Sequence, residues 1–261
     1  MTSMDYFQVS NVNRWFGGLH AIRDCSFSIR AGLTTCLIGP NGAGKTTLFN
    51  LITGFLKPDG GAITFGGRPL VGQSPRAIVG AGIARSFQHL ALFEQLSVVE
   101  NVMVALPGQR DEGPGGALLA VVLPGLRAAR RRSRERAMEL LDMVGLQHRA
   151  NSLVANLSYG EQKLLTIARV LATDAQLMLL DEPASGLDEQ ALHNIVEVLA
   201  GIKAGGRTLM VIEHNAGLVR KIADEVVFLH QGHVMAQGDP EAIIRDPALT
   251  EIYFGGGAVQ A

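Results

Sequence analysis

The sequence of 261 residues has little cysteine, no long apolar run and almost no net charge. Because its only cysteines are Cys25 and Cys36, a disulfide scaffold is excluded, and both are expected to be small buried residues. No apolar run approaches the roughly 18–20 residues that span a bilayer, since the longest candidate, residues 115–126, contains Pro124. The formal net charge of −1 argues against a protein that coats DNA.

The first ten residues are polar and continue into a strand-like pattern, so we expect no cleavable leader. Together with the lack of apolar spans, this predicts a soluble, cytosolic, globular protein. The length suits one large domain, or two lobes that share a core.

Glycine is abundant and charge is unevenly placed. The 31 glycines indicate that several loops need unusual backbone geometry or a close approach to a ligand. Residues 127–149 carry seven Arg and three acidic residues, whereas residues 174–261 carry thirteen acidic and five basic ones. This asymmetry predicts distinct faces for distinct partners.

The apolar pattern predicts an N-terminal antiparallel β portion and an α/β core. Residues 7–12 and 25–29 alternate apolar and polar, while residues 34–38 are dense enough for a strand buried on both faces. The remaining expected elements are helices over 45–52, 127–144 and 191–202, strands over 177–180, 208–212 and 226–229, and helices beginning with capping boxes at Ser97 and Ser158. Their alternation indicates a parallel sheet. Residues 90–170 are expected to form a separate helical lobe, with a variable insertion or surface loop over 107–126.

The strongest chemical signal is a phosphate loop of the form G-x-x-x-x-G-K-[ST]. It reads Gly39-Pro40-Asn41-Gly42-Ala43-Gly44-Lys45-Thr46, and Thr47 completes the candidate nucleotide-binding set. The glycines let backbone N–H groups converge on a phosphate, and the following helix adds its dipole. Lys45 supplies a positive charge to the β- and γ-phosphates, and Thr46 a hydroxyl for Mg²⁺. Its place between a predicted strand and a predicted helix argues against a plain glycine-rich turn.

Two adjacent carboxylates end the predicted strand that begins at Leu177. Asp181 can reach the shell of a Mg²⁺ ion, and Glu182 can polarise the attacking water as a general base. Two solvated acids are the alternative explanation, which the phosphate loop makes much weaker.

The run Leu157-Ser158-Tyr159-Gly160-Glu161-Gln162 makes a family recognisable. The chain resembles the nucleotide-binding subunits of ATP-binding cassette (ABC) transporters, whose signature reads L-S-G-G-Q; here Tyr159 and Glu161 replace the usual Gly and Gln. The resemblance implies an α/β fold, a P-loop NTPase of ABC type: a mixed sheet core, an N-terminal antiparallel β portion and an inserted helical lobe. It makes residues 1–261 a single nucleotide-binding domain with a C-terminal tail over about 240–261.

The resemblance implies that Ser158 and Gly160 contact the γ-phosphate of ATP held by the opposite protomer. A hydroxyl, a closely approaching N–H and a helix N-terminus make this physically reasonable. Glu161 is expected to turn back toward its own helix in a capping box. The alternative is that this run is only a helix N-cap.

Other elements of the family follow along the chain. Gln88 resembles the loop glutamine that senses Mg²⁺ and couples to membrane subunits, and His214 resembles the switch histidine that contacts the γ-phosphate. Residues 185–188 match the D-loop at the dimer interface. Phe16 matches the aromatic residue that stacks on adenine, with Trp15 as second choice. Taken alone, Phe16 could equally be a core residue and His214 an ordinary strand-end histidine.

The resemblance is closest to ATPases of branched-chain and other hydrophobic amino acid uptake systems. Segments 85–93, 106–136, 156–162 and 246–255 support this. It implies that the chain hydrolyses ATP with Mg²⁺. The catalytic candidates are Glu182, His214, Lys45 and Gln88, and the metal candidates are Thr46, Gln88 and Asp181.

The implied assembly pairs two ATPase subunits head-to-tail around two ATP, the second subunit being identical or distinct. Its partners are two membrane permeases and, indirectly, a periplasmic solute-binding protein, with no nucleic acid. The chain is then peripheral, at the cytoplasmic face of the inner membrane. An ATPase of a lipid or lipopolysaccharide exporter, or of an importer for another solute such as urea or amides, remains an alternative. ABC ATPases of DNA repair or translation usually carry two cassettes or a long coiled-coil insertion, and neither fits this length.

The stretch 127–136 contains six Arg and one Glu. It could attract anionic lipid headgroups or an acidic partner, or be a solvated helix face, which is the commoner situation.

Overall fold

The computed structural model describes residues 6–86, 90–108 and 124–254, and these form two compact units. The first unit comprises the described residues within Met1–Arg85, Gln176–Pro183 and Ile202–Ala261. The second comprises those within Ser86–Ala175 and Ala184–Gly201. None of the helices in the described part of the chain is both long and apolar enough to cross a membrane.

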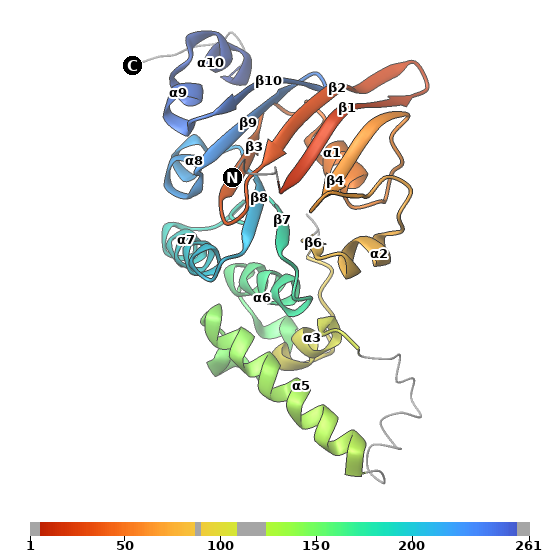
Figure 1. Cartoon of the computed structure of the whole chain (residues 1–261). Helices are drawn as coiled ribbons and strands as arrows, with labels where there is room; N and C mark the ends of the chain where they lie inside the picture. Colours follow the sequence, from red (N-terminus) through yellow and green to blue (C-terminus); the bar gives the residue numbers. More distant parts are fainter. Residues whose placement is uncertain (1–5, 87–89, 109–123, 255–261) are drawn as a thin grey trace. The chain divides into compact units, whose positions relative to one another are not determined.

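An antiparallel sheet opens the first unit, as the alternating N-terminal pattern predicts (Figure 1). Its strand order is β2-β1-β4-β5. The strands are β1 (Phe7–Phe16), β2 (Leu19–Ile29), β4 (Gly60–Phe65) and β5 (Arg68–Pro69). Phe7 and Val9 of β1 are buried in alternation, as predicted, but Val12 is buried one position out of phase because the register with β2 shifts between Val9 and Val12. The strand also extends beyond the predicted range, to Phe16.

The second sheet of this unit is mixed and has the order β10-β9-β3-β8-β7-β6. Its strands are β3 (Thr34–Ile38), β6 (Ile83–Arg85), β7 (Leu177–Asp181), β8 (Thr208–Ile212), β9 (Glu225–His230) and β10 (His233–Gly238). All neighbours are parallel except β10 and β9. Every residue of β3, β7 and β8 is buried, as expected for strands covered on both faces.

The register of the parallel strands brings the chemistry-bearing loops together. Leu37 of β3 and Asp181 of β7 both pair with Ile212 of β8. Because parallel strands end at the same edge of a sheet, the residues that follow these three strands meet at its carboxyl edge. The α/β fold with a mixed sheet is therefore as predicted.

Five helices complete the described part of the first unit: α1 (Lys45–Ile52), α2 (Pro75–Gly80), α8 (Ala216–Ile222), α9 (Pro240–Arg245) and α10 (Pro247–Phe254). Leu48, Phe49 and Ile52 of α1 are fully buried in the core that Leu37 and Ile63 also join. The predicted helix over 45–52 is confirmed with the same bounds. Cys25 and Cys36 are buried thiols, as expected, and burial raises the pKa of Cys25 to about 12.

The second unit is helical in its described part. Its elements are α3 (Val98–Ala105), α5 (Pro124–Met143), the 3₁₀ turns η1 (Gln147–Arg149) and η2 (Val154–Asn156), α6 (Tyr159–Ala172) and most of α7 (Glu189–Ala204). The predicted apolar face of α5 is buried; its members are Ala137, Leu140, Leu141 and, just after the helix, Val144. The six arginines of stretch 127–136 are exposed.

One expectation about this unit needs correction. Residues 107–126 are not all loop, because α5 already begins at Pro124, and proline is well suited to the first turn of a helix. Residues 109–123 of that segment lie outside the described residues.

Candidate nucleotide site

The phosphate loop connects β3 to α1 at the carboxyl edge of the mixed sheet. Gly39, its first residue, has φ of +149°, and a Cβ there would lie 2.0 Å from the carbonyl oxygen of Leu229 in β9. No side chain fits at this point, so glycine lets the loop pass directly against the neighbouring strand. Of the remaining loop residues, Asn41, Gly42 and Thr46 are exposed, Pro40, Gly44 and Thr47 are half-buried, and Ala43 is buried.

The side chain of Lys45 is held against this loop by two backbone carbonyl groups of the loop. Its Nζ donates to the carbonyl oxygens of Gly39 at 2.7 Å and Pro40 at 2.9 Å. Burial lowers the pKa of Lys45, while the negative charges of Glu182 and Asp181 act in the opposite direction. The ammonium group is therefore partly desolvated and under the influence of both carboxylates before any phosphate is bound.

Asp181, the last residue of β7, is fixed by an arginine that the sequence reasoning did not single out. Arg85 Nη2 donates to Asp181 Oδ2 at 2.8 Å, and these side chains are only 5% and 2% exposed. Arg85 Nη1 also donates to Asn50 Oδ1 of α1 at 2.6 Å. One signal of this role was present in the sequence. Arg85 directly follows the apolar pair Ile83-Ala84, and an arginine that is buried with such a pair needs a partner for its charge.

Glu182 combines an accessible carboxylate with an unfavourable backbone conformation. Its φ is +47°, a left-handed conformation that costs a non-glycine residue about 1–2 kcal/mol. Its N–H donates to the carbonyl of Ile212 at 3.1 Å, which ties this residue to β8. Such strain persists where the surrounding structure imposes it, and it gathers at functional sites.

His214 lies next to this glutamate. Its Nδ1 is 3.8 Å from Glu182 Oε1, and the two side chains are 55% and 26% exposed. The buried carboxylate of Glu213 accepts a hydrogen bond from the backbone N–H of His214 at 3.3 Å. The fold thus brings together Lys45, Glu182 and His214, three of the four residues predicted to be catalytic.

Phe16, at the end of β1, is 40% exposed, so the alternative of a core residue is wrong. The guanidinium of Arg14 lies 4.8 Å from the centre of its ring. Trp15, the second choice, instead stacks on His20 with ring centres 3.8 Å apart. Phe16 therefore remains the better candidate for a base-stacking residue.

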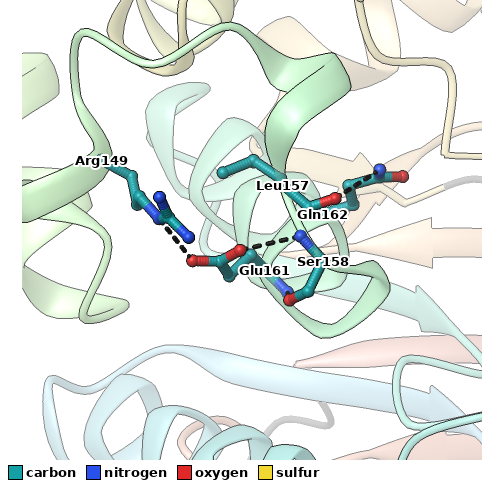
Figure 2. A network of polar contacts seen from close by, with 5 residues as sticks. All are labelled: Arg149, Leu157, Ser158, Glu161 and Gln162. Carbon is teal, nitrogen blue, oxygen red and sulfur yellow. Dashed lines mark hydrogen bonds and ion pairs between the residues drawn. The ribbon is translucent and has the colours of Figure 1, made fainter.

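The signature-like run begins α6 in the second unit, where the predicted capping box is present (Figure 2). Ser158 Oγ accepts from the N–H of Glu161 at 3.3 Å, and Glu161 Oε2 accepts from the N–H of Ser158 at 2.8 Å. Figure 2 also shows Arg149, whose Nε donates to Glu161 Oε1 at 2.8 Å. The carboxylate of Glu161 thus turns toward its own helix and toward an arginine, as expected.

Gly160 has a packing role in addition to its predicted one. A Cβ at Gly160 would lie 3.0 Å from the Cβ of Ala191, so glycine permits a close approach between α6 and α7. Tyr159 is 47% exposed, with Lys163 Nζ at 5.5 Å from its ring centre. In the matched D-loop segment, Asp188 Oδ1 accepts from the N–H of Ala191 at 2.8 Å.

Gln88, predicted both as a catalytic and as a metal residue, lies outside the described residues. Of the predicted site residues that the structure describes, Ser158 and Gly160 belong to the second unit and the others to the first.

Comparisons with known proteins bear on the family to which this chain belongs. The family model described as ABC transporter matches residues 22–185. Over 254 residues the chain is 39% identical to the high-affinity branched-chain amino acid transport ATP-binding protein LivG of Salmonella typhimurium, a match that covers 97% of this chain and 99% of the relative.

Two solved structures extend this similarity to the fold. MJ1267, an ATP-binding cassette of an ABC transporter in its ADP conformation, has a TM-score of 0.82 and 29% identity, and the match covers 97% of this chain and 99% of that one. The dimeric ATP-binding cassette MJ0796, in a post-hydrolysis state bound to ADP and Pi, has a TM-score of 0.74 and 25% identity over 90% of this chain and 98% of that one. Because the sequence similarity runs through nearly the whole chain, and the residues that the family model matches include both the phosphate loop and the carboxylate pair, this chain belongs to the ABC transporter family and is a transport ATPase.

Proposed function

We propose that this chain is the ATP-hydrolysing subunit of an importer for branched-chain or related hydrophobic amino acids. The observation that carries the proposal is the similarity to LivG, which extends over 99% of that relative. Residues 1–261 then act as one nucleotide-binding domain, with residues of about 90–170 as its helical lobe and residues of about 240–261 as its C-terminal tail.

The phosphate groups of ATP bind the loop 39–47. The backbone N–H groups at the start of α1 face the anion with the positive end of the helix dipole. Lys45 exchanges its bonds to the carbonyls of Gly39 and Pro40 for the β- and γ-phosphates, which favour its charged form. Phe16, already exposed at the end of β1, stacks on the adenine ring.

The residues present fit a Mg²⁺ ion, because a hydroxyl and a carboxylate are the hard oxygen donors that this ion prefers. Thr46 and Asp181 would hold it, together with Gln88. When bound, Mg²⁺ neutralises negative charge on the β- and γ-phosphate oxygens. Arg85 holds the carboxylate of Asp181 in one place through the buried ion pair at 2.8 Å.

Glu182 is the general base of hydrolysis. Its carboxylate accepts a proton from the water that attacks the γ-phosphate, and ADP leaves. His214, whose Nδ1 is 3.8 Å from this carboxylate, binds the γ-phosphate and keeps the water and the base aligned. With its left-handed φ, Glu182 leaves the extended path of β7 directly after the last residue of that strand.

A complete site needs two chains. Ser158 and Gly160 of one protomer contact the γ-phosphate on the other, so an isolated monomer hydrolyses ATP slowly. The dimeric state of MJ0796 with ADP and Pi supports this arrangement. ATP closes the pair, hydrolysis opens it, and two membrane permeases at the cytoplasmic face of the inner membrane receive the movement, with a solute-binding protein delivering the solute.

The test is to purify the tagged chain from its native membranes and identify its companions by mass spectrometry. We expect two multi-span permeases and a second ATPase. The same complex, reconstituted in vesicles with its solute-binding protein, should take up leucine only with ATP, and the Glu182→Gln complex should not. Small single-span bridge proteins instead of permeases would move the assignment to lipid export, and uptake of urea or amides instead of leucine would move it to another solute.

A further inference from the structure

The C-terminal helix α10 reaches the histidine of the candidate hydrolysis site. The hydroxyl of Tyr253, in the last turn of this helix, donates a hydrogen bond to the backbone carbonyl of His214. The two residues are 39 positions apart in the sequence, and both belong to the first unit.

Tyr253 is held in place by apolar packing against the mixed sheet. Its ring centre lies 6.1 Å from that of Phe228 in β9, at an angle of 55° between the planes. Phe228, Ile243 and Leu249 line an apolar pocket together with this ring. Burial raises the pKa of Tyr253 to about 12, with a further contribution from the charge of Glu213, so the hydroxyl is a donor at every physiological pH.

The carbonyl that Tyr253 binds stands at the junction between β8 and α8. On its N-terminal side, Glu213 binds the N–H of His214 at 3.3 Å. On its C-terminal side, Asn215 Oδ1 accepts from the N–H of Leu218 at 3.0 Å and caps α8. Tyr253 therefore anchors the peptide group between His214 and Asn215, which joins the end of β8 to the start of α8. The backbone of His214 is then restrained both at its N–H and at its carbonyl.

This restraint on the backbone of His214 can act on the hydrolysis reaction only through the imidazole of that residue. The imidazole of His214 is exposed and lies 3.8 Å from Glu182, so its own packing does little to orient it. The backbone sets where an exposed side chain starts and which rotamers it can adopt, and a small misplacement of a catalytic group lowers the rate strongly.

We propose that Tyr253 is a positioning residue of the ATPase: by binding the carbonyl of His214 it holds this histidine against Glu182, and thereby makes the C-terminal helix a determinant of the hydrolysis rate. The proposal rests on the function proposed above, in which His214 aligns the attack on the γ-phosphate.

The experiment is a double-mutant cycle in the purified transporter complex, with kcat and KM for ATP measured for each variant. Tyr253→Phe removes only the hydroxyl and keeps the ring against Phe228. We expect kcat to fall about three- to tenfold, the size of one hydrogen bond, with KM unchanged because the phosphate loop is untouched. The matched control is Tyr6→Phe, since Tyr6 packs edge-on against Phe65 in the antiparallel sheet and should leave kcat unchanged.

The second arm places Tyr253→Phe in a His214→Ala background. If the hydroxyl acts through His214, the double variant should hydrolyse ATP as slowly as His214→Ala alone. A wild-type kcat in Tyr253→Phe, or an equal loss in both backgrounds, would overturn the inference and leave the proposed function intact. Full turnover of His214→Ala would instead remove His214 from the proposed mechanism, and this inference with it.

Discussion

Arg85 and Asp181 form a buried ion pair between the adjacent parallel strands β6 and β7, with Arg85 Nη2 at 2.8 Å from Asp181 Oδ2. The same guanidinium binds Asn50 of α1 and lies 5.3 Å from the ring centre of Phe49. One arginine thus joins two strands and the helix that follows the phosphate loop, so the position of the metal candidate Asp181 depends on a residue that belongs to neither the phosphate loop nor the carboxylate pair.

Replacing Arg85 should destabilise the fold. In Arg85→Met, Asp181 loses its guanidinium partner while remaining buried, and breaking a buried pair in this way costs about 3–5 kcal/mol. Urea unfolding of the nucleotide-free protein measures the loss. The control is Arg131→Met, because the pair of Arg131 with Glu135 is largely exposed and contributes little. Equal midpoints for the two variants would contradict the importance of the buried pair.

Removing the charge of the general base should separate binding from hydrolysis. In Glu182→Gln the amide cannot accept the proton of the attacking water, so turnover should fall at least a hundredfold while ATP still binds. Because the closed pair then cannot open by hydrolysis, ATP should convert the variant to a dimer in size-exclusion chromatography. Glu189→Gln, at an exposed position at the start of α7, is the control. Ordinary turnover in Glu182→Gln would refute the assignment of the base.

Replacing Lys45 should weaken nucleotide binding itself. Lys45→Ala removes the cation that the loop holds at 2.7 Å from the carbonyl of Gly39. We expect ATP affinity to fall about tenfold or more, as for the loss of a hydrogen bond to a charged group. Equilibrium binding of a fluorescent ATP analogue reports this directly, with the exposed Lys57→Ala as control. Unchanged affinity in Lys45→Ala would exclude Lys45 from the phosphate site.

The capping box at Glu161 should make stability depend on pH. Burial raises the pKa of Glu161, but hydrogen bonds from Arg149 and Ser158 outweigh it and leave this pKa below its usual 4.5. A depressed pKa means that the stabilisation is present above about pH 4.5 and is lost as the pH falls through the folded-state value. Glu161→Ala should therefore cost about 1 kcal/mol at neutral pH and lose less stability than wild type on acidification.

A graded series tests this account by thermal unfolding at several pH values. Glu161→Gln retains a capping-box residue but loses the charge that Arg149 binds, so it should fall between wild type and Glu161→Ala. Glu139→Gln breaks an exposed ion pair on α5 and serves as the control. If Glu161→Ala and Glu161→Gln both melt like wild type at neutral pH, as the control should, the capping network does not stabilise the helix.

Local spacing made several features predictable. Three of them depend on residues within a few positions of one another: the helix after the phosphate loop, the capping box of Ser158 and Glu161, and the buried strand β7. The short strand β6 and the helix α2 were not predicted, because three and six residues are too few to display a period. Whether Phe16 lies in the core could not be decided from the pattern for a different reason. An aromatic residue in an alternating strand does not show which face of the strand is solvated, and the side chain of Phe16 is exposed.

The chemistry of this protein can be inferred from its residues in order, because the phosphate loop, the carboxylate pair and the capping box each lie within a few consecutive positions. Which groups support that chemistry depends on the folded chain. Arg85 meets Asp181 across 96 positions and Tyr253 meets His214 across 39. These pairs arise from strand order and from the docking of α10 on the sheet, which no local pattern encodes. The left-handed φ of Glu182 likewise occurs together with a backbone hydrogen bond to Ile212, a residue of the neighbouring strand.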